Sequence, residues 1–193
     1  PNYPQEGAMR GGHVAGAVED ARRAVSLGPE HVSCYGLTLE NLAEDVRMAK
    51  DVRRGRLKVA DDDLQVEMGE RVREVLRRAG YRRYEISNYA RPGFESRHNT
   101  LYWVGHEWVA AGCGAHGFRR LEDGRGLRYA NPRKPDAYLT AVETGAAPEI
   151  EREVLEPAAL FEERIFLGLR LARGVDLEAA ARETIGEVPA RLW

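Results

Sequence analysis

The segment "YEISNYARPGFESRHNTLYW", Tyr84 to Trp103, contains the point at which the pattern of the chain changes. Before it, amphipathic helical segments alternate with short apolar and β-branched runs, which is typical of α/β folds. From Tyr89 to Asn99 the sequence is rich in turn residues, and extended pieces and a hairpin follow. We therefore expect an α/β arrangement up to about Asn88 and a different one after it.

Two helix–strand pairs are predicted before the change. Apolar spacing indicates a helix over 13–27 that stops at Gly28, followed by a strand over 31–40. A second helix follows Asp61–Asp63, which offer an N-cap, and leads to a strand over 81–87. Short links between such pairs imply parallel strands joined by crossovers.

The second half of the chain reads differently. Residues 100–103 and 107–112 are expected to be short extended pieces, and 119–131 a hairpin with a Gly-containing turn. Further helices are expected over 135–145, over 156–172 and after Asp176, the middle one apolar nearly all round and so central to a small packed unit.

Charge and composition narrow the class of partner. The chain has 193 residues and a formal charge of -2 from 29 basic and 31 acidic residues, so it presents no strong field for nucleic acid. No apolar run is long enough for a transmembrane segment, and the beginning lacks the pattern of a signal peptide. Cys34 and Cys113 are predicted to be free thiols, and the protein to be cytoplasmic.

Three motifs have competing explanations. "GCGAHG", Gly112 to Gly117, has the spelling of a dinucleotide loop, but no helix opens after it, which favours a tight turn or a close backbone contact. Cys113 and His116 with His98 and His106 could form a zinc site, although no paired ligand spacing supports one. Glu40 and Glu85, near strand ends, could meet a polar ligand or form salt bridges with arginines.

The best constellation is His98, Asn99, Tyr102 and Trp103. A neutral imidazole can ligate iron, and aromatic faces pack on a flat apolar macrocycle. The structural alternative is a hydrogen-bonded histidine among aromatic core neighbours, which the pattern alone leaves open.

Several segments occur in the order found in one family. "PNYPQEG", "LGPEHVSCYGLTLE", "RGRLKVADDDLQVEM", "GYRRYEISNYARPGFESRHNTLYW", "GCGAHGF" and "FLGLRLARGVDL" together resemble the oxygen-independent coproporphyrinogen III oxidase-like radical S-adenosylmethionine (SAM) family. More narrowly, they are similar to its heme-chaperone branch. The resemblance runs from the first residues to about Leu177.

The resemblance implies a fold and a division of the chain. The expected fold class is α/β: the C-terminal part of a radical SAM, partial TIM-like β/α barrel, then a small α+β or helical C-terminal domain. Residues 1–90 would supply the last βα units of the barrel. Residues 91–150 would be a post-barrel region carrying the H-N-x-x-Y-W block, and 151–193 the start of the helical domain. The chain is thus expected to be a C-terminal fragment.

The resemblance also implies cofactors and site residues. His98 would be the iron ligand for heme, with Asn99, Tyr102 and Trp103 around it, and the backbones of Gly36 and Ile86 would contact SAM. The family's C-x-x-x-C-x-x-C motif for a [4Fe-4S] cluster is absent, and Cys34 and Cys113 cannot replace three thiolates. No catalytic residue is assigned, and the chain alone is expected to be inactive.

Two departures from the family pattern concern these sites. Ser96 stands where the chaperone branch usually has cysteine, which leaves open how this member handles heme. The segment "NLAEDVRMAKD" also departs from the family's continuation after Glu40.

The implied function is a heme chaperone that binds heme and transfers it to an acceptor protein. SAM and the cluster would be held mainly by sequence outside this chain. The alternatives are an oxygen-independent coproporphyrinogen III dehydrogenase, which decarboxylates propionates in heme biosynthesis, and a degenerate barrel without cofactors that serves as an interaction module. The acceptor and the oligomeric state are not specified by the sequence.

Overall fold

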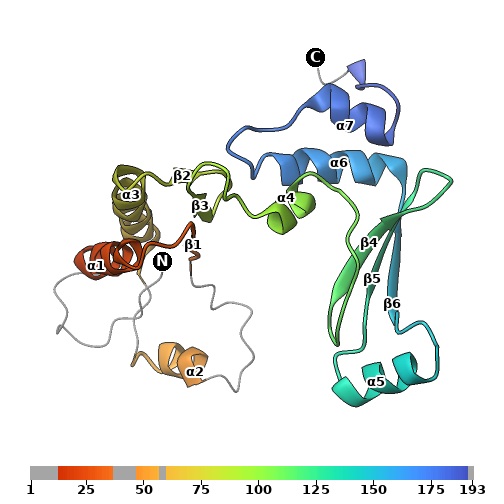
Figure 1. The fold of residues 1–193 in the computed structure, drawn as a ribbon, viewed down its shortest axis with the longest axis horizontal. Helices are drawn as coiled ribbons and strands as arrows, with labels where there is room; N and C mark the ends of the chain where they lie inside the picture. The colour runs from red at the N-terminus through yellow and green to blue at the C-terminus, as the bar shows by residue number, and fades with distance from the viewer. Residues whose placement is uncertain (1–12, 37–46, 57–59, 191–193) are drawn as a thin grey trace. The chain divides into compact units, whose positions relative to one another are not determined.

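A computed structural model describes residues 13–36, 47–56 and 60–190 (Figure 1). Contacts within the chain divide it into two compact units, Pro1–Glu95 (unit 1) and Ser96–Trp193 (unit 2).

Unit 1 contains two packed helices and a small sheet. Its elements are α1 (His13–Ser26), β1 (His31–Ser33), α2 (Arg47–Arg53), α3 (Asp62–Arg78), β2 (Arg82–Arg83) and β3 (Asn88–Ala90). Helices α1 and α3 bury their apolar faces against each other, with Ala17, Met68 and Leu76 in the core. The Asp61 carboxylate accepts the Leu64 N–H at 2.9 Å, so the predicted helices and N-cap are confirmed.

The two predicted strands, β1 and β2, are not hydrogen-bonded to each other. The strand order is β1-β3-β2, and β3 is antiparallel to both neighbours, so β1 and β2 run in the same direction with β3 between them. The chain reverses because the buried Glu85 carboxylate accepts the Ser87 N–H at 2.9 Å, which closes a short turn. Tyr89 and Ala90, expected to lie in a loop, therefore belong to β3, which returns alongside β2.

Unit 2 contains an antiparallel sheet and four helices in its described part. Its elements are α4 (Arg97–Trp103), β4 (His116–Arg120), β5 (Gly126–Ala130), α5 (Pro135–Glu143), β6 (Glu151–Leu155), α6 (Pro157–Gly168) and α7 (Leu177–Thr184). The hairpin, α5 and the Asp176-capped α7 confirm the predictions for those segments. The extended pieces are not confirmed, because residues 100–103 lie in α4 and 107–112 contribute only a bridge between Trp108 and Phe118.

Helix α6 is less enclosed than its sequence suggested. Leu160 and Phe161 are buried, but Phe166 and Leu169 are 67% and 66% exposed. The expectation that this apolar helix is central to a packed unit is therefore wrong for this side of the helix.

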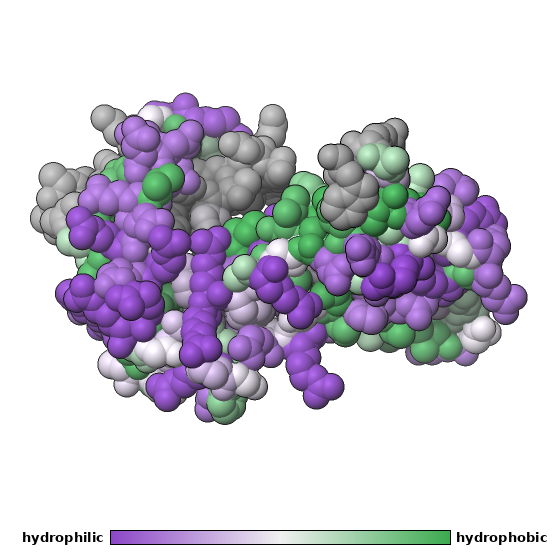
Figure 2. Space-filling view, turned by 90° about the horizontal axis from the view of Figure 1, so that it is seen from above, coloured by the Kyte–Doolittle hydropathy of each residue, from purple (hydrophilic) through white to green (hydrophobic). Residues whose placement is uncertain are grey.

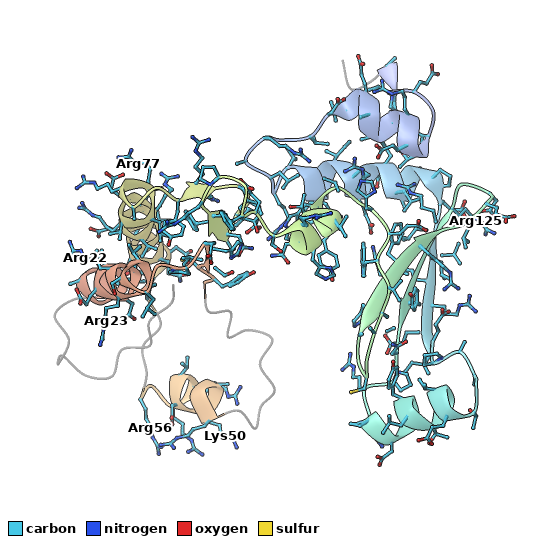
Figure 3. All side chains as sticks on the ribbon, viewed as in Figure 1. Arg22, Arg23, Lys50, Arg56, Arg77 and Arg125 are labelled. Atoms are coloured by element: carbon cyan, nitrogen blue, oxygen red, sulfur yellow. The ribbon has the colours of Figure 1, made fainter. Side chains whose placement is uncertain are left out.

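The surface mixes charged and apolar side chains. Figure 2 shows hydrophilic and hydrophobic residues interspersed over the face that it draws. In Figure 3, labelled cations extend from separate elements: Arg22 and Arg23 from α1, Arg77 from α3, and Arg125 from the β4–β5 turn. In the part of the chain that the structure describes, no helix has the length and apolar character needed to cross a membrane.

Candidate functional site

Helix α4 carries all four residues of the H-N-x-x-Y-W block. Ser96 is its N-cap, and the Ser96 hydroxyl accepts the Asn99 N–H at 3.2 Å. Gly105, with a φ of 61°, follows the helix and turns the chain away. Because serine is a strong N-cap residue, Ser96 has a structural role here.

One face of α4 presents an accessible imidazole. His98 is exposed, and its Nε2 lies 2.8 Å from the Tyr102 hydroxyl, one helical turn away. The two rings meet edge-on, with centroids 5.0 Å apart. The pair joins an aromatic row, since Tyr102 lies 4.6 Å from Trp108 and Trp108 lies 5.3 Å from Phe118, centroid to centroid.

Asn99 and Trp103 lie one turn apart on the neighbouring stripe of the helix. The Arg170 guanidinium carbon lies 4.7 Å from the centroid of the Trp103 ring, a cation–π geometry that fixes the indole next to α6. The Trp103 Nε1 is buried and has no hydrogen-bond partner in the structure. The block therefore divides into an exposed His98 bonded to a half-buried Tyr102, and a Trp103 side chain that packs within unit 2.

The segments of Gly36 and Ile86 are joined by the backbone of unit 1. The Cys34 N–H donates to the Ser87 carbonyl at 2.7 Å, one peptide beyond β1 and just after Ile86. Gly36 is exposed and so is Ile86, so both residues lie at an open end of this small sheet.

A polar group that the sequence did not reveal lies beside these segments. Asn88 is 1% exposed, accepts the Ser33 hydroxyl at 2.5 Å, and donates to the Tyr35 hydroxyl at 3.3 Å. Little in the sequence indicated this polar group, because its members, Ser33, Tyr35 and Asn88, are recognisable there only as polar residues near strand ends. Its effect is to fix the end of β1 against β3.

The other sequence candidates are resolved as follows. Glu85 forms the turn described above, and among the described residues no arginine forms an ion pair with it. Glu40 lies outside the described residues. In the described ranges, no three His, Cys, Asp or Glu side chains lie close enough together to hold a metal ion.

The glycine-rich segment is a turn into a strand, as predicted. Gly112 and Gly114 have φ values of 98° and 68°, and β4 begins at His116 where a dinucleotide site would need a helix. A Cβ on Gly117 would overlap the Tyr129 ring, so this glycine allows a close approach within the sheet.

Comparisons with known proteins show which proteins the chain is similar to. No family model matches the chain. The heme chaperone HemW of Mycobacterium tuberculosis (strain CDC 1551 / Oshkosh) is 38% identical over 169 residues, which cover 86% of this chain and 41% of that protein. Heme chaperone HemW of Lactococcus lactis subsp. lactis (strain IL1403) is 38% identical over 159 residues, which cover 82% of this chain and 39% of that protein.

The fold itself matches a solved structure. Coproporphyrinogen III oxidase (HemN) from Escherichia coli, a radical SAM enzyme, aligns with a TM-score of 0.59 and 13% identity over 84% of this chain and 38% of that one. The mixed α/β structure is thus similar to part of that enzyme, while the chain spans about two fifths of the length of the curated relatives. This chain belongs to the family of HemW heme chaperones and HemN-like radical SAM proteins.

Proposed function

We propose that the protein carrying this chain binds heme and passes it to an acceptor protein. The observation that carries the proposal is the exposed His98 imidazole, bonded to Tyr102 on α4, in a chain 38% identical to proteins named heme chaperones. An exposed ligand suits a carrier, because heme held at a surface is accessible to the protein that receives it. The reducing cytoplasmic setting expected from the sequence remains part of the proposal.

The His98 ring has one nitrogen to offer to iron. Its Nε2 is engaged with the Tyr102 hydroxyl, and among the described residues nothing bonds to Nδ1. Histidines that bind metals usually donate their other N–H to an oxygen, which fixes the tautomer and the ring orientation. In this proposal His98 ligates iron through Nδ1, Tyr102 orients the ring, and Asn99 and Trp103 shape the surroundings.

SAM and a [4Fe-4S] cluster complete the proposed protein. The backbones of the exposed residues Gly36 and Ile86 would contact SAM at the open end of the unit 1 sheet. The cluster would be held by cysteines outside this chain, because Cys34 and Cys113 are its only two. Residues 1–90, 91–150 and 151–193 would then be the barrel, post-barrel and helical parts.

Heme transfer tests this proposal. The full-length protein is loaded with heme, separated from free heme, and mixed with the apo form of a heme-binding protein whose Soret band differs. We expect the acceptor's band to appear faster than from an equal amount of heme bound to serum albumin. Transfer no faster than from albumin would contradict a chaperone role.

A product assay distinguishes the enzyme alternative. The same protein is supplied with coproporphyrinogen III, SAM and a reductant under anaerobic conditions. We expect no protoporphyrinogen IX, whereas its appearance would assign the protein to the dehydrogenases.

A further inference from the structure

Unit 2 contains a groove that the H-N-x-x-Y-W block does not use. It has a volume of about 670 Å³ and is lined by residues of α4, α6 and α7, and Figure 1 shows α6 beside both α4 and α7. Its apolar wall includes Leu101, Val104, Leu171 and Val175. This volume is within the range of sites that take small-molecule ligands and cofactors, about 300–1,000 Å³.

The groove lies on a different face of α4 from His98. Thr100, Leu101 and Val104 line it, whereas His98 and Tyr102 do not. At about 100° per residue, Thr100 and Val104 lie about 160° and about 120° around the helix from His98, and Leu101 lies about 60° from it. A ligand in the groove therefore occupies a separate place from one bound at His98.

Two guanidinium groups and two carboxylates line the groove, those of Arg164, Arg173, Asp176 and Glu183, and of these four side chains only Arg173 has no hydrogen bond or ion pair with a described residue. Arg164 donates to Glu183 at 3.0 Å, and the Asp176 carboxylate accepts the Ala179 N–H at 2.9 Å as a helix cap. Arg173 also lines the groove, is exposed, and makes no ion pair with any described residue. A carboxylate of the ligand would supply its missing partner.

The groove is also lined by a histidine side chain. His106, just after α4, is exposed and lines the same groove, and its side chain has no hydrogen-bond partner among the described residues. An apolar wall, a free imidazole and an unpaired guanidinium match the three chemical parts of heme: its macrocycle, its iron and its propionates.

We propose that this groove is a second heme-binding position, with His106 as iron ligand and Arg173 bound to a propionate. The inference rests on the proposed function, because heme is the ligand of that function. It adds a place, separate from the exposed His98, in which apolar walls cover part of the macrocycle.

Heme titrations of the full-length protein test the inference in a His98→Ala background, where the groove is observed alone. We expect saturable binding of one heme in His98→Ala, followed by the Soret band. Adding His106→Ala should abolish it, and adding Arg173→Glu should weaken it about tenfold or more, because the substitution removes one charged hydrogen bond and places a carboxylate beside the propionate. The controls are His116→Ala, another exposed histidine, and Arg133→Glu, another exposed arginine of unit 2, neither of which lines the groove.

The outcomes separate the two proposals. If wild type binds heme and His98→Ala binds none, the groove is not a heme site and the proposed function stands. Binding in His98→Ala that is unchanged by both groove substitutions also overturns the inference. If wild type binds no heme, the proposed function fails together with the inference.

Discussion

The Tyr102 hydroxyl lies one helical turn from His98 and bonds to its Nε2 at 2.8 Å. The two rings meet edge-on, and this contact holds the imidazole in place. Tyr102 is fixed in turn against Trp108, so the position of His98 depends on a row of aromatic contacts within unit 2. The sequence predicted which residues form the block. It could not predict that Trp103 turns instead toward Arg170, because that contact joins residues distant in the chain.

Removing the Tyr102 hydroxyl tests its orienting role. We expect Tyr102→Phe to weaken heme binding about tenfold or more, as loss of a partner that orients a metal-bound histidine does. Tyr35→Phe, which removes a hydroxyl from unit 1, should leave the affinity unchanged. Both dissociation constants come from Soret titrations, and equal affinities in wild type and Tyr102→Phe would show that the hydroxyl has no such role.

The two cysteines should differ in reactivity. Burial raises the pKa of the Cys34 thiol above its ordinary value, so less of the reactive thiolate is present at a given pH, while Cys113 is exposed. We expect iodoacetamide at pH 8 to modify Cys113 first, as followed by peptide mass spectrometry. In Cys113→Ser, labelling should stay slow. Equal initial rates at the two sites would contradict the difference.

Secondary-structure elements with a strong local signal were predicted best. Helix α3 has a regular apolar stripe, an aspartate cap and a glycine stop with a φ of 88°, and it formed as expected. Strand β6 was missed because Glu151–Glu153 and Val154 are exposed and only Leu155 is buried, so no alternation marks it. Strand β3 was missed because the turn before it depends on the Glu85 side chain.

The cap of α3 gives a test at this scale. We expect Asp61→Ala to lower the free energy of unfolding by about 1 kcal/mol, because the Leu64 N–H loses its acceptor. Asp61→Asn should restore most of the loss, since asparagine caps nearly as well. Chemical denaturation followed by circular dichroism measures both. An alanine variant as stable as wild type would show that the cap contributes little.

At the scale of the molecule, each unit carries part of the proposed function. Unit 1 places Gly36 and Ile86 at the open end of its sheet, and unit 2 carries α4 and the groove. The similarity to heme chaperones was predictable from ordered motifs that extend over most of the chain. The groove was not, because its walls come from residues 100 to 183 and no local pattern links them.

The measurement that tests the account most directly is a heme titration of the full-length protein and its His98→Ala variant, followed by the Soret band. We predict saturable binding in wild type and loss of one binding component in the variant, because the exposed imidazole on α4 is a ligand to iron. A variant whose titration curve coincides with that of wild type would contradict the account and leave His98 a histidine that only bonds to Tyr102.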